Sequence, residues 1–158
     1  SACLVGSEMC IRDRPQGMRL RIVGRIEPVI AERYRDVLAS DTVEAVGFVQ
    51  DVHAQFARSD VFILPSLEEG DPLVTYEAAL HGLPIIASPM GGGRMGDVPG
   101  RMILVDPVTP EALAQAMRTL AAAADLRAEL GGTVRRAVEE YDWSQVAARR
   151  FAALGKAL

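Results

Sequence analysis

The sequence contains very little cysteine and lysine, and these shortages exclude several classes of protein. Its two cysteines, Cys3 and Cys10, lie within the first ten residues, and their spacing fits neither a metal site nor a disulfide framework. Lys156 is the only lysine, no basic run is present, and the net charge is −4, so nothing indicates binding to nucleic acid. No apolar run approaches the ~20 residues that cross a bilayer, and the first residues lack a signal-peptide pattern. We therefore predict a soluble, cytoplasmic domain.

What the sequence does contain is typical of one globular domain. Its 158 residues are enough for a single core. Hydrophobic residues make up 49% and charged residues 24%, which is ordinary globular composition. Neither an internal repeat nor a linker divides the chain, so we expect one domain.

Apolar runs and helical patterns alternate along this domain. Short apolar runs predict buried strands at 19–24, 43–48, 60–65, 83–88 and 101–106. Helical spacing predicts helices at 28–39, 51–59, 72–82, 109–123, 125–141 and 142–154. Because the strands are continuously apolar and the connections are short, we predict a doubly wound, Rossmann-like α/β fold, in which helices cover both faces of a parallel sheet.

The segments after residue 105 are expected to form amphipathic helices. Thr109 stands before a proline and predicts a helix start. Gly131 and Gly132 weaken the helical pattern of 125–141. Trp143 and Phe151 are expected to pack the final helix onto the domain.

The loop and helix after the strand at 60–65 carry the first candidate site. In an open parallel sheet, ligands bind outside the carboxyl ends of the strands. Glu69 lies in this loop and Glu77 in the early turns of the helix; Gly70 allows a close approach of backbone to ligand, and a helix start attracts anions. Carboxylates accept hydrogen bonds from hydroxyl groups, so a sugar nucleotide fits this combination. The alternative is that these glutamates, with Glu68, are solvated surface charges.

A glycine-rich segment at 89–100 is the second candidate. We expect it to be a long loop after the strand at 83–88, in which Gly91, Gly92 and Gly93 let the backbone approach a phosphate or sugar and Arg94 adds charge. The alternative is a flexible turn without a ligand. Elsewhere, His53 and His81 are interpreted as surface or turn residues.

Taken together, the stretch from 57 to 93 resembles the donor-binding half of the retaining group-one (family four) glycosyltransferases, which have the GT-B fold. The family pattern is a strand ending in Pro-Ser, then Glu-Gly, a second Glu, Gly-Leu-Pro, an apolar strand and a Gly-Gly pair. The matching residues are Pro65, Ser66, Glu69, Gly70, Glu77, Gly82, Leu83, Pro84, Gly91 and Gly92. With its flanks, the resemblance covers about residues 18 to 154.

The resemblance implies a role for each matched residue. Glu69 would bind hydroxyl groups of the transferred sugar near the reacting centre, as the catalytic carboxylate, and Glu77 would hold the ribose. The implied donor-binding set is Glu69, Gly70, Asp71, Pro72, Leu73, Glu77, Gly91 and Gly92. Such enzymes need no metal and no cofactor beyond the nucleotide-sugar substrate, because positive side chains and helix dipoles stabilise the leaving diphosphate.

The chain also departs from the family pattern. Asp71 stands where the family often has an aromatic or other apolar residue, and the glutamate that commonly follows the Gly-Gly pair is missing. The family's first strand, its loop with an arginine and a lysine, and its acceptor-binding domain are also missing; we do not assign Arg25 to that loop. We therefore predict that residues 15–158 are an incomplete donor-binding domain. Its expected partners are the nucleotide-sugar donor and the missing acceptor-binding domain, which would also supply any membrane contact.

The first fourteen residues differ in character from the rest. The stretch SEMCIRDR resembles the translation of a sequencing adapter, so we expect residues 1–14 to be an artefactual leader. The alternative is a divergent N-terminal segment, or a genuine strand at ACLVG.

Four functions remain open at this point. The leading prediction is a glycosyltransferase that transfers a sugar with retention, of which this chain is the donor half with little or no activity alone. The second is a nucleotide-sugar binding module without catalysis. A sugar-nucleotide epimerase ranks third, and a glycoside hydrolase that uses Glu69 and Glu77 ranks last.

Overall fold

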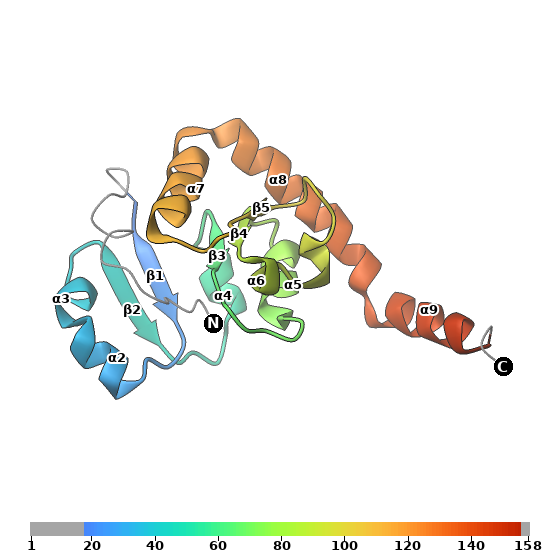
Figure 1. Ribbon diagram of the computed structural model, residues 1–158, viewed down its shortest axis with the longest axis horizontal. Helices are drawn as coiled ribbons and strands as arrows, with labels where there is room; N and C mark the ends of the chain where they lie inside the picture. The colour runs from blue at the N-terminus through green and yellow to red at the C-terminus, as the bar shows by residue number, and fades with distance from the viewer. Residues whose placement is uncertain (1–17, 156–158) are drawn as a thin grey trace.

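All five predicted strands are present in the computed structural model, which describes residues 18–155 (Figure 1). Each observed pairing is parallel, as the continuous apolar runs indicate. The strands are β1 (Leu20–Val23), β2 (Val43–Gly47), β3 (Phe62–Leu64), β4 (Ile85–Ala87) and β5 (Ile103–Leu104). The prediction of one sheet needs a refinement, because the pairs form two groups, β1-β2 and β3-β4-β5.

Helices surround both groups of strands. Those between the strands are α2 (Pro28–Arg33), α3 (Arg35–Leu38), α4 (His53–Phe56), α5 (Leu73–Leu80) and α6 (Pro89–Gly96). The C-terminal part consists of α7 (Pro110–Ala122), α8 (Ala124–Ala137), the 3-10 helix η1 (Val138–Tyr141) and α9 (Trp143–Gly155). The predicted helix at 28–39 is thus interrupted once, at Tyr34, between α2 and α3.

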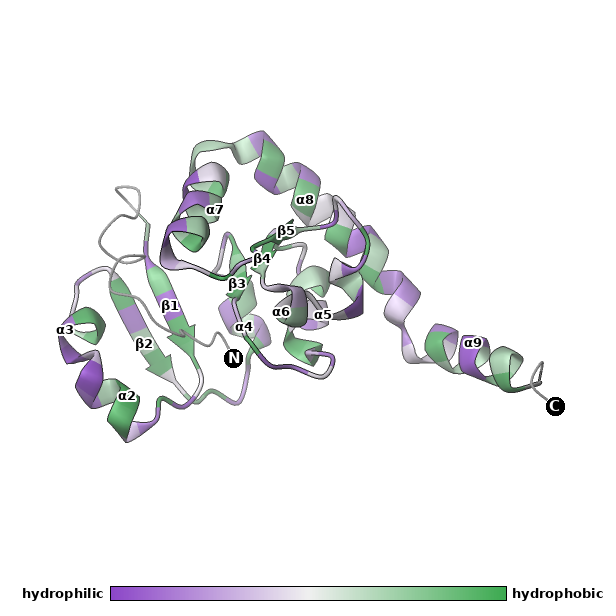
Figure 2. Cartoon of the chain, in the orientation of Figure 1, coloured by the Kyte–Doolittle hydropathy of each residue, from purple (hydrophilic) through white to green (hydrophobic). Residues whose placement is uncertain are grey.

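The core lies on both faces of the sheet β3-β4-β5. Successive side chains of a strand point to opposite faces. Accordingly, Ile85 and Ala87 of β4 belong to one buried cluster, with residues of α5 and η1, whereas Ile86 belongs to a second cluster with α7 and α8. Figure 2 shows β3 and β4 as hydrophobic along their length. This two-sided burial confirms the predicted α/β fold with helices on both faces.

Helix α7 forms as its sequence predicts. The Thr109 side chain accepts a hydrogen bond from the Ala112 N–H at 3.2 Å, which caps the helix start. The apolar stripe Leu113, Met117 and Leu120 is buried. Local sequence and tertiary packing therefore agree over this helix.

Helix α8 forms despite its glycine pair, and the reason is a close backbone contact. A Cβ atom on Gly131 would lie 2.2 Å from the Gly82 carbonyl oxygen, in the turn after α5. Only glycine lets the helix pass this carbonyl. The packing of α8 therefore offsets the weak helix propensity of the residue.

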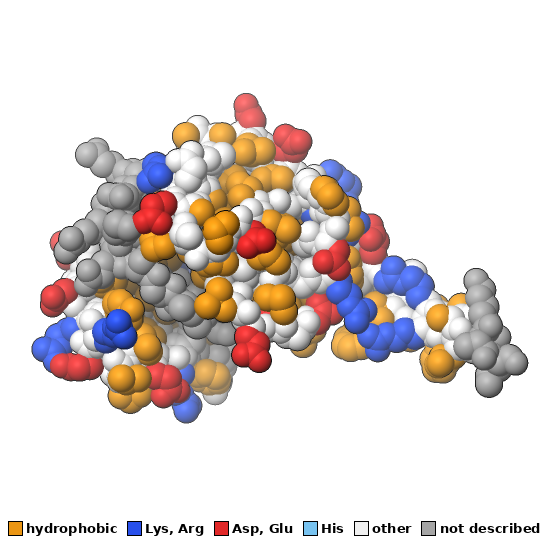
Figure 3. All heavy atoms as spheres, viewed as in Figure 1, with side chains coloured by type: hydrophobic (Ala, Val, Ile, Leu, Met, Phe, Trp, Pro, Cys, Tyr) orange, Lys and Arg blue, Asp and Glu red, His pale blue; other side chains and the backbone are white. Residues whose placement is uncertain are grey.

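Two predictions about the helices are wrong. The glycine-rich segment is not a loop but α6, which begins at Pro89 behind the N-cap Ser88 and bends at Gly93. Trp143 and Phe151 do not pack α9 onto the domain, because each is 74% exposed. Figures 1 and 3 show α9 extending away from the body of the molecule, with apolar and basic side chains on its surface. None of the helices within residues 18–155 has the length and hydrophobicity to cross a membrane.

Candidate functional site

The two predicted site segments meet beyond the carboxyl ends of β3 and β4. The buried Ser88 hydroxyl, after β4, donates to the Ser66 carbonyl oxygen, after β3, and accepts a hydrogen bond from the Gly91 N–H at 2.8 Å. One side chain thus ties both strand ends to the first turn of α6. This is the edge at which an open parallel sheet binds ligands.

Gly91 brings α6 against the end of β3. Its carbonyl oxygen accepts a hydrogen bond from the buried Thr75 hydroxyl of α5 at 2.7 Å. A Cβ atom at this position would lie 2.0 Å from the Leu64 carbonyl oxygen. Gly92 is equally buried, against Met102 and Leu104. The structure therefore gives both glycines a packing role, and donor binding by them stays a prediction.

Asp71 fastens the loop between β3 and α5 to the bend of α6. Its Oδ1 accepts hydrogen bonds from the Tyr76 hydroxyl at 2.5 Å and from the Arg94 N–H at 3.4 Å. Its Oδ2 lies 3.5 Å from Arg94 Nε. Gly93, at the bend, has φ 54° and ψ −157°, and a Cβ there would lie 2.7 Å from Asp71 Oδ1. The carboxylate of Asp71 is therefore engaged by the protein itself.

Tyr76 and Tyr141 form the far side of this junction, with ring centroids 4.9 Å apart. Burial, together with the hydrogen bond to Asp71 and the charge of that carboxylate, raises the pKa of the Tyr76 hydroxyl above its ordinary value. Tyr141 donates to the Arg94 carbonyl oxygen at 3.1 Å and accepts from Arg101 at 3.2 Å. These contacts hold the backbone of α6 at its bend.

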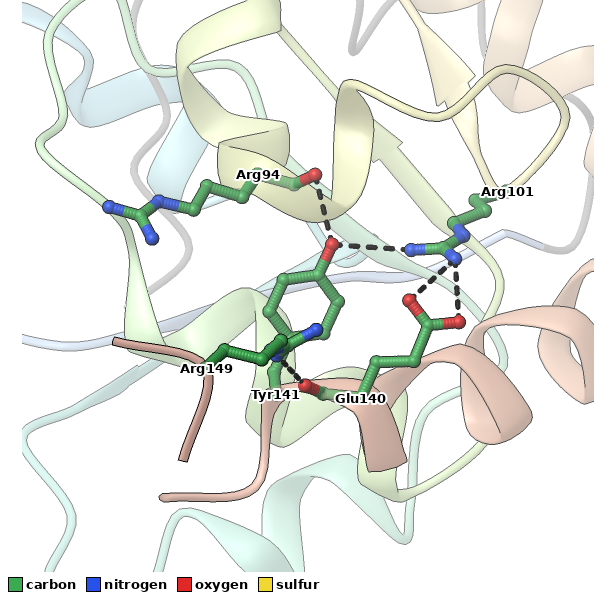
Figure 4. Close-up of polar contacts among 5 residues, drawn as sticks. All are labelled: Arg94, Arg101, Glu140, Tyr141 and Arg149. Atoms are coloured by element: carbon green, nitrogen blue, oxygen red, sulfur yellow. Dashed lines mark hydrogen bonds and ion pairs between the residues drawn. The ribbon is translucent and has the colours of Figure 1, made fainter. Parts of the chain in front are cut away.

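Arg101 completes the arrangement shown in Figure 4. Its Nη2 contacts both carboxylate oxygens of Glu140 at 2.9 Å, and its side chain is only 12% exposed. Glu140 and Tyr141 belong to η1, just before α9 begins. The C-terminal segment is thereby anchored beside the candidate site.

Glu69 and Glu77 differ from Asp71 in having no partner among the residues that the structure describes. Both are half-buried, whereas Glu68 is exposed. Within residues 18–155, neither carboxylate accepts a hydrogen bond or forms an ion pair. Their acceptor capacity is available to hydroxyl groups of a ligand.

The start of α5 lies between these two glutamates in the sequence. Pro72 is the N-cap and supplies no side-chain hydrogen bond to the first turn. Gly70 is exposed, with open space where its Cβ would be, and Leu73 is 66% exposed. An accessible helix start of this kind suits an anionic group.

No group of three or more potential metal ligands occurs within the part of the chain that the structure describes. His53 and His81 are exposed, as predicted, and contact each other, with His53 Nδ1 2.9 Å from His81 Nε2. The independence from metal remains a prediction.

Sequence reasoning did not identify Thr75, Tyr76 or Ser88 as residues that organise the site. For Ser88 a signal was present, because serine before proline is a typical helix start. Thr75 and Tyr76 gave no comparable signal. Their partners, Gly91 and Asp71, lie in a bent helix and a loop, where sequence spacing does not predict which residues meet. The structure thus identifies side chains that hold the predicted binding segments in place through hydrogen bonds.

The described fold, with a candidate anion and hydroxyl site at the carboxyl edge of parallel strands, is that of a Rossmann-like domain. The family model of the group 1 glycosyl transferases matches residues 7–123, and the chain belongs to this family. The MMP alpha-(1->4)-mannosyltransferase of Mycolicibacterium hassiacum is 32% identical over 154 residues, which cover 89% of this chain and 36% of that protein.

Solved structures agree on the fold. The Anabaena protein HepE in complex with UDP superimposes with a TM-score of 0.77 at 19% identity, covering 97% of this chain and 45% of that one. Sucrose-phosphate synthase from Thermosynechococcus elongatus gives a TM-score of 0.71 at 26% identity, covering 92% and 41%. These likenesses confirm the predicted GT-B-type fold, and the match to the family model confirms the predicted group-one family.

The chain spans only part of its relatives. The first curated matches, which include a sulfoquinovosyl transferase of Arabidopsis thaliana and a D-inositol 3-phosphate glycosyltransferase of Paenarthrobacter aurescens, are covered over 18% and 23% of their length. The comparisons show that this chain belongs to an enzyme family. Because the chain covers only part of these relatives, they do not assign its substrates.

Proposed function

We propose that this chain binds a nucleotide-sugar donor as the donor half of a sugar transferase. The observation that carries the proposal is the availability of Glu69 and Glu77 on either side of an accessible helix start. Their carboxylates would accept hydrogen bonds from sugar and ribose hydroxyls, while the α5 N-terminus would face the diphosphate. The Anabaena neighbour with UDP supports this assignment by its ligand.

In this proposal the two glutamates have different tasks. Glu77 holds the ribose of the nucleotide, and Glu69 binds the transferred sugar at the reacting centre, with retention of configuration. Gly70, Asp71 and Leu73 contribute backbone N–H groups rather than side chains, and Pro72 between them sets the start of α5. This agrees with the engagement of the Asp71 carboxylate by Tyr76 and Arg94. No metal is assigned to the site.

Transfer itself requires a second part of the protein. An acceptor-binding domain would close the cleft over Glu69, so residues 15–158 alone are expected to bind the donor and to show little or no transfer. We place the protein in the cytoplasm, where nucleotide sugars are available as substrates.

Calorimetric titration of the 158-residue chain with UDP, GDP and ADP, and with their glucose conjugates, tests this proposal. Glu77→Gln should weaken binding of the nucleotide and of its glucose conjugate equally, by about 10- to 100-fold, which corresponds to the loss of one hydrogen bond to a charged group. Glu69→Gln should weaken binding of the conjugate only, because the free nucleotide carries no transferable sugar. Glu68→Gln, an exposed neighbour, is the matched control.

Equal behaviour of the Glu69→Gln and Glu68→Gln variants would contradict the assignment of Glu69. Absence of binding for every nucleotide and every conjugate would overturn the proposed function itself.

A further inference from the structure

Two imidazoles, those of His53 and His81, meet on the surface of this protein, and the proposed function uses neither of them. His53 is the first residue of α4, and His81 is the C-cap of α5. Their nearest ring nitrogens, His53 Nδ1 and His81 Nε2, lie 2.9 Å apart, and both residues are exposed. The chain has no other histidine. The fold therefore brings both of its imidazoles to one exposed point.

Both imidazole rings pack against Phe56, which is buried. The ring centroid of Phe56 lies 6.5 Å from that of His53 and 5.4 Å from that of His81. Phe56 in turn contacts Phe62 of β3 edge-on, with centroids 5.9 Å apart. An aromatic pair anchored in the core therefore helps to position the two imidazoles, in addition to their contact with each other.

The backbone at each histidine is also held by hydrogen bonds. The His81 N–H donates to the Ala78 carbonyl oxygen at 3.1 Å, which closes the last turn of α5. The His53 carbonyl oxygen accepts a hydrogen bond from the Ala57 N–H at 3.0 Å, within the turn of α4. Side chains that are positioned before a ligand arrives lose less conformational freedom when they bind it. The two imidazoles are thus suited to act as a pair.

The separation of the two nitrogens matches that of neighbouring ligands on one metal ion. Imidazole nitrogens bind zinc at about 2.0–2.1 Å, so two nitrogens at a right angle around an ion of this size lie about 3.0 Å apart, and two at a tetrahedral angle about 3.4 Å apart. The observed 2.9 Å is closer to the right angle. Right angles between ligands are typical of tetragonal Cu²⁺ and Ni²⁺ sites, which readily take imidazole.

We propose that His53 and His81 form a two-imidazole site for a divalent transition-metal ion of the Cu²⁺ and Ni²⁺ class, with water in the remaining coordination positions. In the neutral pair, one of the facing nitrogens donates a hydrogen bond to the other. When the ion binds, that proton moves to the second nitrogen of the same ring, so both imidazoles stay neutral and each offers one lone pair. Because both residues are exposed, their rings can rotate to direct the two lone pairs at the ion.

Two carboxylates belong to the segments that carry the histidines. Glu77 lies one helical turn before His81, and its carbonyl oxygen accepts from the His81 N–H at 3.4 Å; side chains four residues apart on a helix are neighbours. Asp51 precedes His53 by two residues and accepts from the Ala54 N–H at 3.1 Å. Negative charge at these positions favours a cation. The ion would link the start of α4 to the end of α5, and this inference does not depend on the proposed function.

Calorimetric titration of the full chain with nickel chloride tests the site, after alkylation of the cysteines so that thiols cannot bind the metal. We expect one Ni²⁺ per chain. Because the second imidazole binds the ion intramolecularly, His53→Gln and His81→Gln should each weaken binding on the order of 100-fold. The double variant should bind hardly more weakly than either single variant. Ala57→Gln, at the exposed C-cap of α4, is the matched control and should keep the affinity of the parent.

The same variants distinguish one shared site from two independent ones. Independent imidazoles would each bind an ion of their own, so a single substitution would halve the number of ions bound and leave the affinity of the remaining imidazole unchanged. This result would overturn the proposal. A loss of affinity in only one of the two single variants would overturn it as well, because the other histidine would then not be a ligand.

Electron paramagnetic resonance of the chain with one equivalent of Cu²⁺ gives a second measurement, which can be made on the parent itself. Hyperfine splitting from two imidazole nitrogens is expected in the parent, and splitting from one in each single variant. Circular dichroism establishes that each variant is folded. A spectrum that is the same in the parent and in the double variant would place the copper elsewhere in the chain and overturn the proposal.

Discussion

Replacing Gly91 with alanine should disrupt the junction on which the candidate site rests. The new Cβ would lie 2.0 Å from the Leu64 carbonyl oxygen and 3.1 Å from the Ser88 hydroxyl oxygen. Both neighbours are held, one by the β3 backbone and the other by its hydrogen bonds to Ser66 and Gly91, so α6 must move away from β3.

The loss in the free energy of unfolding of Gly91→Ala has two contributions. Overpacking a rigid site costs about 1–3 kcal/mol, and movement of α6 also breaks the Thr75 hydrogen bond to Gly91, worth about 1 kcal/mol. We therefore expect a loss of about 2–4 kcal/mol, which is a large share of the stability of about 5–15 kcal/mol typical of a domain.

Urea unfolding, followed by circular dichroism, measures this loss. With a slope of about 2 kcal/mol/M, the midpoint should fall by about 1–2 M. Gly70→Ala is the matched control, because a Cβ at position 70 meets open space, and its midpoint should stay near that of the parent chain. A Gly91→Ala midpoint as high as that of Gly70→Ala would refute the reasoning.

Three further predictions concern the tyrosine junction and α9. Below pH about 10, Tyr76→Phe should be less stable than the parent by about 1 kcal/mol. The pKa of Tyr76 is raised in the folded state, so the unfolded chain loses the Tyr76 proton at a lower pH than the folded chain does. The stability difference between the parent and Tyr76→Phe should therefore shrink as pH rises above about 10. A difference in urea midpoint that does not change with pH would contradict this. Arg101→Met should lower the free energy of unfolding by about 1 kcal/mol, and Glu140→Gln should lower it by less, because solvent partly screens the half-exposed Glu140 carboxylate. A larger loss for Glu140→Gln than for Arg101→Met would contradict this reasoning. Trp143, the single tryptophan, should fluoresce in the native chain at nearly the wavelength seen in urea, because its side chain is exposed, and a clear red shift on unfolding would show that α9 packs against the protein.

The strands and α7 could be predicted because local sequence and tertiary environment agree there. Phe62 to Leu64 and Ile85 to Ala87 are apolar throughout, and both faces of their sheet are covered by helices. Thr109 caps α7 with its own side chain. In these segments the pattern of the sequence carries enough information without knowledge of distant contacts.

The wrong predictions concern segments whose structure depends on contacts with residues distant in the sequence. Three successive glycines favour a loop by propensity, yet α6 forms because Ser88, Thr75 and Leu64 leave room only for a glycine backbone. Trp143 and Phe151 have the spacing of a packed face, but no described element lies against that face. Among the candidate site residues, Glu69 and Glu77 were predicted from their motif, and their binding roles stay a prediction. The supporting contacts of Tyr76 required knowledge of the folded arrangement.

The contact between Gly131 and the Gly82 carbonyl also limits how the chain can vary in length. A helix turns by about 100° per residue, so one residue inserted into α8 ahead of Gly131 would turn a different side chain onto the Gly82 carbonyl, where a Cβ has only 2.2 Å. Insertions and deletions should therefore be rejected between the start of α8 and Gly131. They should be better tolerated in the exposed turn at 97–100, where a Cβ on Gly100 would meet no atom within 4 Å.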